Sequence, residues 1–305
     1  DIYGCDPCVF INTKRAVFMI KEALTGLECF TTMKDIISTI KDFLSNLSYS
    51  ISDKPVICTT KEKTYLLFDL FLLSANKTLD SIYVCCVNGC FADANVLIRK
   101  YRDDLFLYLF ILEVLDNRKK LTESTIQKGY RKNKDDKAVD AWFDNKAFSG
   151  KFKRELDIAN YFDRLKNNHE IKRCISQYGL EPIWENIRKK LNDYTHNNGI
   201  KFIKHNLLRF LNKEDVEDCV KSILQDIGFI TSIFLVILIL IRPNYIMASD
   251  YIDYMDLGIK PPESSQHWVA PFISEYIDEY IVKLHPELKA FLHYNNKYGM
   301  RILCD

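Results

Sequence analysis

Apolar residues recur at intervals of three and four along most of this chain, which is the spacing of one face of an α-helix. No alternating apolar and polar pattern of any length is visible, so strands are not expected. Gly and Pro are scarce, at 10 and 8 residues, which argues against a turn-rich fold. The sequence therefore predicts an all-α fold, a multi-helix bundle with a long central helix. The principal stretches with the helical pattern are 12–25, 36–47, 61–75, 79–116, 137–148, 157–167, 170–178, 182–196, 201–211, 214–241 and 272–284.

The expected central helix runs over residues 79–116, with a weak point at Gly89. Arg99, Arg102 and Asp103 lie at i, i+3 and i+4 in this stretch and therefore share one face. Apolar residues surround them, and charges in such surroundings usually need partners. One interpretation is a facing charged element. The other is an Arg99–Asp103 pair that only stabilises the helix.

A run of fifteen uncharged residues, 227–241, is flanked by Asp226 and Arg242. It is short for a transmembrane helix, which needs about 20 apolar residues. We expect a buried core helix and no stable membrane insertion, with a membrane segment as the alternative. Residues 48–58 are expected to form a loop, and 61–75 a buried helix.

Charge is unevenly distributed along the chain, although the net charge is only +1. Residues 118–213 carry 23 Lys and Arg against 12 Asp and Glu, whereas 1–117 carry 12 against 15 and 214–305 carry 7 against 14. A basic middle third fits the electrostatic footprint of a protein that binds a nucleic-acid backbone. A solvated surface of helices gives the same counts.

The ten cysteines lie mostly inside apolar helical patterns, where cysteine behaves as a small hydrophobic residue. The first residues show no secretory signal. We therefore expect free thiols and a cytoplasmic protein. Cys5 and Cys8 form a lone CxxC without a second pair at zinc-binding spacing. Nucleotide-binding glycine motifs and HExxH are missing from the sequence, so neither a cofactor nor a metal is expected.

Three consecutive domains are expected from these patterns. They are an N-terminal helical subdomain (1–78), a helical core (79–242) that includes a basic insert (118–150), and a C-terminal helical extension (243–305).

The stretch from Arg188 to Gly199 holds the candidate chemistry. His196 ends a basic helical segment and is followed by Asn-Asn-Gly, a strong helix stop. Cleavage of RNA without a metal needs a base for the 2′-hydroxyl proton and cations for the phosphorane. His196 and Arg188 supply these groups and Asn192 can orient the ring, so these three are the expected catalytic residues. Lys190 and Asp193 are expected to support them, with Asp193 paired to a basic neighbour.

The segments Leu97–Asp104 and Leu191–Asn198 together resemble the HEPN superfamily of all-α proteins. Its signature is an Arg followed after four to six residues by His at a helix end. Seven residues separate Arg188 from His196, and five separate Lys190 from it. The chain also resembles uncharacterised bacterial proteins linked to abortive phage infection. The resemblance implies a HEPN-like core, a homodimer with two facing motifs, and Arg99, Arg102 and Asp103 as supporting residues.

Two functions are therefore expected from the sequence. The first is a metal-independent endoribonuclease of a bacterial antiviral defence or toxin-type system, with RNA as its partner. The second is a non-catalytic helical module of HEPN-like fold that binds a nucleotide or a protein.

Overall fold

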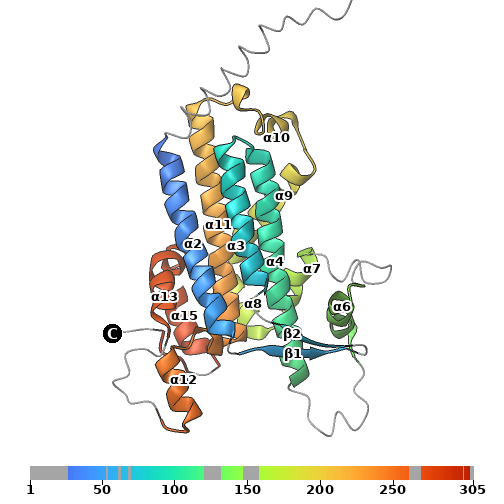
Figure 1. The fold of residues 1–305 in the computed structure, drawn as a ribbon, viewed down its shortest axis with the longest axis vertical. Helices are drawn as coiled ribbons and strands as arrows, with labels where there is room; N and C mark the ends of the chain where they lie inside the picture. Colours follow the sequence, from blue (N-terminus) through green and yellow to red (C-terminus); the bar gives the residue numbers. More distant parts are fainter. Residues whose placement is uncertain are drawn as a thin grey trace, which may run out of the picture. The chain divides into compact units, whose positions relative to one another are not determined.

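A computed structural model of the chain describes residues 27–52, 54–60, 63–67, 70–119, 132–146, 158–260, 269–297 and 299–302. Within these ranges the chain is an all-α, multi-helix fold with one small two-stranded sheet, which confirms the expected fold class (Figure 1). Contacts divide the chain into two compact units. Unit 1 comprises Asp1–Lys41, Lys77–Tyr101 and Glu185–Gly228, and unit 2 comprises Asp42–Asn76, Arg102–Trp184 and Phe229–Asp305.

Each unit is built from three separate ranges of the chain. The three consecutive domains expected from the sequence stay a prediction. The long helices α2, α3, α4, α9 and α11 each contribute residues to both units. The helices are α2 (Glu28–Ser52), α3 (Leu70–Val87), α4 (Phe91–Lys119), α6 (Lys134–Phe143), α7 (Ile158–Leu165), α8 (His169–Gln177), α9 (Leu180–Thr195), α10 (Ile200–Lys204), η2 (Leu208–Phe210), α11 (Lys213–Ile241), η3 (Pro243–Ile246), α12 (Ser249–Asp256), α13 (Pro271–Tyr276), η4 (Ile277–Ile281), α14 (Val282–Leu284) and α15 (Leu288–Asn295).

The expected single helix over 79–116 is two helices, because α3 ends at Val87 and α4 begins at Phe91. Gly89 lies in the turn between them with φ +73°, a left-handed conformation that glycine adopts without steric cost. A Cβ built on Gly89 would lie 2.2 Å from Cγ of Leu208 in η2. Glycine is therefore required both by the turn and by the close approach of Leu208 within unit 1.

Unit 2 is built around the second half of α11. All thirteen residues from Phe229 to Ile241 are buried. Phe234 packs against Tyr108 of α4, with ring centroids 6.4 Å apart. The hydroxyl of Tyr276 in α13 lies 3.4 Å from Oγ of Ser232 in α11, and its ring stacks on Phe43 of α2 at 4.1 Å. A helix that is apolar on all sides must be enclosed, and inside unit 2 these neighbours enclose it.

Two helices are long and apolar enough to cross a membrane, judged by length and composition alone. They are Leu70–Val87, with 33% of its apolar window buried, and Lys213–Ile241, with 83% buried. Both are weak evidence of a membrane segment, because the core helix of a soluble protein passes the same test.

A β-hairpin in unit 2 corrects two expectations from the sequence. Strands β1 (Val56–Thr59) and β2 (Thr64–Leu67) pair antiparallel, with Val56 opposite Leu67. The expected loop over 48–58 and the expected helix over 61–75 are therefore wrong in these parts. The apolar stretch from Tyr65 onward holds a strand and the start of α3, and a short apolar run does not distinguish the two.

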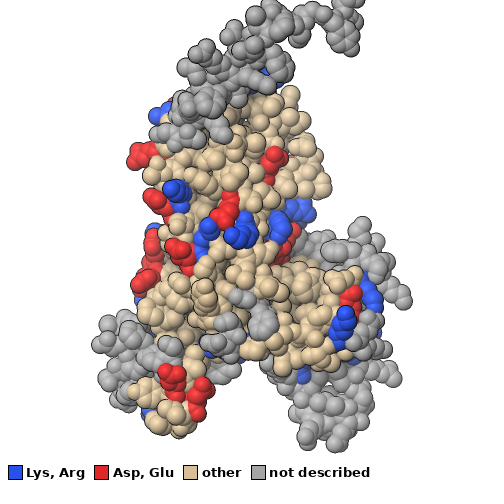
Figure 2. Space-filling view, in the orientation of Figure 1, with Lys and Arg blue, Asp and Glu red and all other residues tan. Residues whose placement is uncertain are grey.

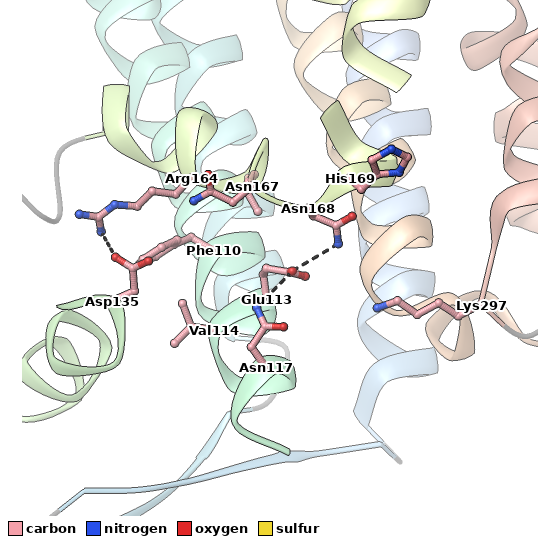
Figure 3. Close-up of a pocket in the computed structure, with 11 residues that line it drawn as sticks. Phe110, Glu113, Val114, Asn117, Asp135, Arg164, Asn167, Asn168, His169 and Lys297 are labelled. Carbon is pink, nitrogen blue, oxygen red and sulfur yellow. Dashed lines mark hydrogen bonds and ion pairs between the residues drawn. The ribbon is translucent and has the colours of Figure 1, made fainter. Parts of the chain in front are cut away.

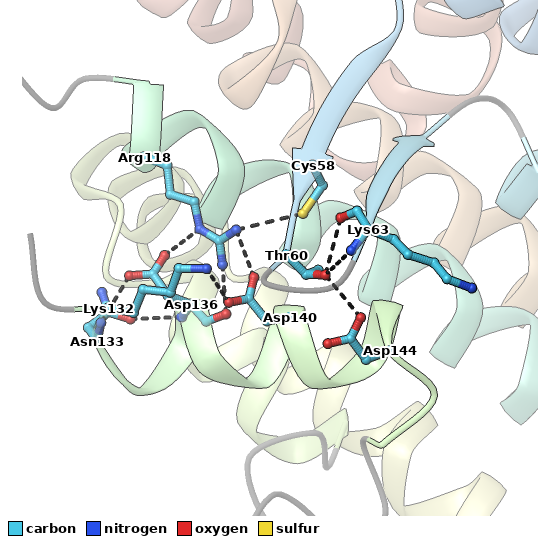
Figure 4. Close-up of polar contacts among 9 residues, drawn as sticks. All are labelled: Cys58, Thr60, Lys63, Arg118, Lys132, Asn133, Asp136, Asp140 and Asp144. Carbon is cyan, nitrogen blue, oxygen red and sulfur yellow. Dashed lines mark hydrogen bonds and ion pairs between the residues drawn. The ribbon is translucent and has the colours of Figure 1, made fainter.

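A network of charges joins the hairpin, α4 and α6 within unit 2 (Figure 4). Nε of Arg118 donates to Oδ1 of Asp136 at 2.6 Å, and its Nη1 lies 3.1 Å from Asp140. Lys132 also pairs with Asp140. Thr60, beside β1, donates to Asp144 after α6 at 3.0 Å. Two cations of the expected basic insert are thus held in ion pairs.

Several expectations fall outside the described residues. They are the helix over 12–25, the CxxC of Cys5 and Cys8, and the parts of the basic insert at 120–131 and 147–150. The seven described cysteines form no disulfide with one another.

Replacing Gly89 by Ala should destabilise the protein more than the same change at Gly179. Both glycines have left-handed φ, +73° and +62°, but a Cβ at Gly179 meets nothing within 4 Å. Gly179→Ala should cost about 1 kcal/mol for the backbone conformation alone. Gly89→Ala should cost about 1–3 kcal/mol more, because Leu208 must move. Urea unfolding of both variants measures the difference, and equal losses would contradict the close approach.

Candidate functional site

A cavity in unit 1 brings together the two helices that carry the predicted site. It has a volume of about 460 Å³. Its wall is formed by the first turns of α4, the last turn of α9 and the segment around α10; the residues are Ala92, Asp93, Val96, Tyr194, Thr195, Asn197, Ile203, Asn206 and Leu207. Arg99 lies three residues after Val96 on α4, which places it on the same helical face.

The cavity is held by Asn206, which caps α4 from a distant part of the chain. Oδ1 of Asn206 accepts from the backbone N–H of Ala92 at 2.9 Å and of Asp93 at 3.1 Å. Its Nδ2 donates to the Asp93 carboxylate at 2.9 Å. The carbonyl of His205 accepts from the N–H of Phe91 at 3.0 Å. These bonds satisfy donors that a helix N-terminus leaves without intrahelical partners.

His196 lies directly after α9, between two residues of the cavity wall. Its backbone N–H donates to the carbonyl of Asn192 at 3.0 Å. The next residue, Asn197, has a left-handed φ of +49°, so the helix ends where the Asn-Asn-Gly stop predicts. The imidazole is exposed, and it forms no hydrogen bond or ion pair with any residue that the structure describes, Arg99 included.

The other expected site residues around His196 are engaged elsewhere. Arg188 pairs with Glu185, one turn earlier on α9, at 2.6 Å. Lys190 pairs with Asp226 of α11 and donates to Ser222 at 2.8 Å. Burial raises the pKa of Asp226, and the nearby Lys190 opposes that shift. Lys190 therefore joins α9 to α11.

Asn192 and Asp193 lie in the last turn of α9 and are half-buried. The carboxylate of Asp193 accepts from Nδ2 of Asn198 at 2.9 Å, and its carbonyl accepts from the Asn198 N–H at 3.0 Å. Asp193 was expected to pair with a basic neighbour, and it instead stabilises the polar turn that follows His196.

Arg102 and Asp103 belong to unit 2. Arg102 is fully buried, and its Nη2 donates to the Asp103 carboxylate at 2.7 Å. Its guanidinium lies 5.5 Å from the ring centroid of Trp184. A charge in an apolar surround thus has the partner that burial demands, and this partner is the adjacent residue.

A buried polar group that the sequence did not indicate lies beside the cavity. The hydroxyl of Tyr194 lies 2.8 Å from Nδ1 of His205, and Sγ of Cys219 lies 4.0 Å from the same atom. Burial, then the nearby Lys201, lower the pKa of His205, and burial raises the pKa of Tyr194. The Tyr194 hydroxyl therefore donates a hydrogen bond to the neutral imidazole and keeps its proton. No local spacing signals this contact, because it forms across the turn between α9 and α10.

Four cations of the basic middle third lie close to His196 in the sequence, within residues 189–209 of unit 1. Many of the others form ion pairs, and on the face drawn in Figure 2 basic and acidic side chains are mixed. These four are exposed and form no ion pair with any described residue; they are Lys189, Lys201, Lys204 and Arg209. Lys204 and Arg209 lie 5.7 and 4.8 Å from the ring centroid of Phe210, which is 49% exposed. We call this surface, with His196, the basic corner.

His205 should make the protein less stable in mild acid. Because the pKa of folded His205 is lowered, the unfolded chain binds a proton that the folded chain resists as the pH falls through the ordinary histidine range. The free energy of unfolding should drop from about pH 7.5 to about pH 5.5. His205→Asn keeps an acceptor for Tyr194 but does not titrate, so its drop should be smaller. An identical pH dependence in chemical unfolding would contradict this account.

Comparison with known proteins identifies no relative of this chain. No family model matches it, and no curated protein or solved structure matches it either. The geometry of the basic corner and the cavity is therefore what supports a function.

Proposed function

We propose that the chain binds RNA at the basic corner of unit 1 and cleaves it there without a metal ion, with His196 as the general base. One observation carries this proposal: four exposed cations without ion-pair partners gather on the same short part of the chain as an exposed histidine. Elsewhere in the basic third, Arg118 and Lys132 are neutralised by carboxylates. Lys137 and Lys172 of unit 2 are exposed without an ion pair to a described residue, but no histidine beside them in the sequence is both exposed and unpaired.

Binding to RNA would rest on phosphates and bases together. Lysine and arginine without carboxylate partners are available to phosphates, and their contacts release condensed counterions. Phe210 is half-exposed between Lys204 and Arg209. An aromatic ring beside cations is a surface on which an unpaired base can stack.

Cleavage would use the RNA's own 2′-hydroxyl. The imidazole of His196 takes the proton of this hydroxyl, and the oxygen attacks the adjacent phosphorus. The bond from phosphorus to the 5′-oxygen breaks, leaving a 2′,3′-cyclic phosphate, and water protonates the departing oxygen. Arg188 can turn to the phosphate, because its exposed pair with Glu185 contributes at most about 1 kcal/mol. Lys190 stays between α9 and α11 in this scheme.

A second candidate is a non-catalytic binding module. It is favoured by the His196 imidazole, which has no described group to orient it, although catalytic contacts often tighten only when substrate is bound. A homodimer and a role in bacterial defence remain predictions of the HEPN resemblance, and a cytoplasmic location remains a prediction from the cysteine pattern. Burial of 83% of the apolar window in α11 supports a chain without stable membrane insertion.

Purified protein should cut single-stranded RNA in a metal chelator, and His196→Ala should lower the rate by about 10²-fold or more, because a general base contributes about 10²–10⁴-fold. RNA affinity should change little. His285→Ala, which alters a half-buried histidine of unit 2, is the matched control and should keep full activity. Binding without cleavage by the wild type would favour the second candidate, and neither binding nor cleavage would contradict both.

A further inference from the structure

Reactive groups outside the basic corner are engaged differently in the two units. Unit 2 has a cavity of about 400 Å³, and in its wall Arg164 and Asp135 neutralise each other at 2.9 Å (Figure 3). Unit 1 has two thiols in the turn between α3 and α4, Cys85 and Cys90, which are not bonded to each other. The proposed RNA chemistry uses neither thiol, so their reactivity is free for another role.

The turn between α3 and α4 is a Schellman motif, which brings Cys85 and Cys90 together. The backbone N–H of Cys90 donates to the carbonyl of Cys85 at 2.9 Å. The N–H of Gly89 donates to the carbonyl of Cys86 at 2.9 Å, and Gly89 is the left-handed residue that the motif contains. In such a motif the side chains at its two ends frequently contact each other. Here these two side chains are both cysteines.

The backbone hydrogen bond holds Cys85 and Cys90 at a separation that a disulfide can span. Its N and O atoms are 2.9 Å apart. Because only short covalent links join these atoms to the two Cα atoms, the Cα atoms are no more than about 6.8 Å apart. Disulfides join Cα atoms about 4.4–6.8 Å apart. Burial, then the neighbouring Cys90, raise the pKa of Cys85, which agrees with two thiols this close.

A small reagent can reach both thiols of this pair. Cys85 and Cys90 are half-buried, whereas Cys86 between them is fully buried. Sγ of Cys90 lies 3.8 Å from the carbonyl oxygen of Asn88, a contact that is weak because a thiol is a weak donor. Burial raises the pKa of Cys85 and of Cys90. Since the thiolate is the nucleophile, the pair reacts slowly at neutral pH and needs an oxidant in excess.

We propose that Cys85 and Cys90 are a reversible redox pair, which a low-molecular-weight disulfide of the glutathione class converts to a disulfide across this turn. The thiolate of one cysteine attacks the reagent, which forms a mixed disulfide and releases one reduced thiol. The second cysteine attacks the protein sulfur of this mixed disulfide and releases the other reduced thiol. The two thiols of the protein lose two protons and two electrons, which reduce the S–S bond of the reagent. The new bond ties the end of α3 to the first turn of α4, which Asn206 caps.

Incubation of the full chain with oxidised glutathione, followed by alkylation of free thiols in denaturant, tests this proposal. The tryptic peptide 78–99 contains Cys85, Cys86 and Cys90. Mass spectrometry should find it with two hydrogens fewer and with only Cys86 alkylated. Hydroxylamine cleaves the Asn-Gly bond that precedes Cys90, and the two halves should then separate only after reduction. Excess reduced glutathione should restore all three thiols.

Serine variants test whether both cysteines are needed. Cys85→Ser and Cys90→Ser should each abolish the cross-link in this peptide. Cys29→Ser, which alters a half-buried cysteine of α2 in unit 1, is the matched control and should retain it. The peptide map of the wild type decides the proposal even if a serine variant does not fold. The proposal is overturned if the three thiols stay reduced, if glutathione stays attached as a mixed disulfide, or if either cysteine bonds elsewhere in the chain or to a second copy.

Discussion

The enclosure of α11 is the constraint on which the rest of this structure depends. From Phe229 to Ile241 the helix is buried residue after residue, and an apolar helix of this kind is stable only when other elements cover it on all sides. Within unit 2, Tyr108 of α4 and Tyr276 of α13 contact this helix, and Phe43 of α2 stacks on Tyr276. In unit 1 the same helix is amphipathic, and Asp226 fixes Lys190 of α9. One helix thus provides a core to unit 2 and an attachment for α9 in unit 1.

The basic corner depends on a second constraint, the cap that Asn206 provides for α4. This side chain draws the segment after α10 onto the first turn of α4, and Leu208 then meets the turn that only Gly89 fits. A hydrogen bond between Tyr194 and His205 joins the end of α9 to the segment after α10. These hydrogen bonds of Asn206 and Tyr194 shape the basic corner without using His196 or the four exposed cations. Those five side chains face solvent, where an anionic polymer can reach them.

Long helices could be predicted from the sequence because their apolar spacing repeats over several turns. The hairpin could not, since its strands have four residues each and show too few alternations to compete with a helical pattern. Gly89 indicated a weak point, but its close approach to Leu208 could not be predicted, because Leu208 is far away in sequence.

The end of α9 just before His196 followed from the Asn-Asn-Gly stop. The ion-pair partners of Lys190 and Arg102 could not be predicted from the sequence, because tertiary packing determines which charged groups meet. The contact between Tyr194 and His205 likewise depends on how the turn folds back.

The central claim is that the cations of the basic corner meet RNA phosphates. The salt dependence of affinity for single-stranded RNA tests it most directly, compared between the wild type and a Lys201→Gln, Lys204→Gln, Arg209→Gln variant. Three lost phosphate contacts should reduce the slope of log affinity against log salt by about two units, at about 0.7 per contact. A control with Lys137→Gln and Lys172→Gln, two exposed lysines of unit 2, should keep the wild-type slope. An unchanged slope in the triple variant would contradict the claim.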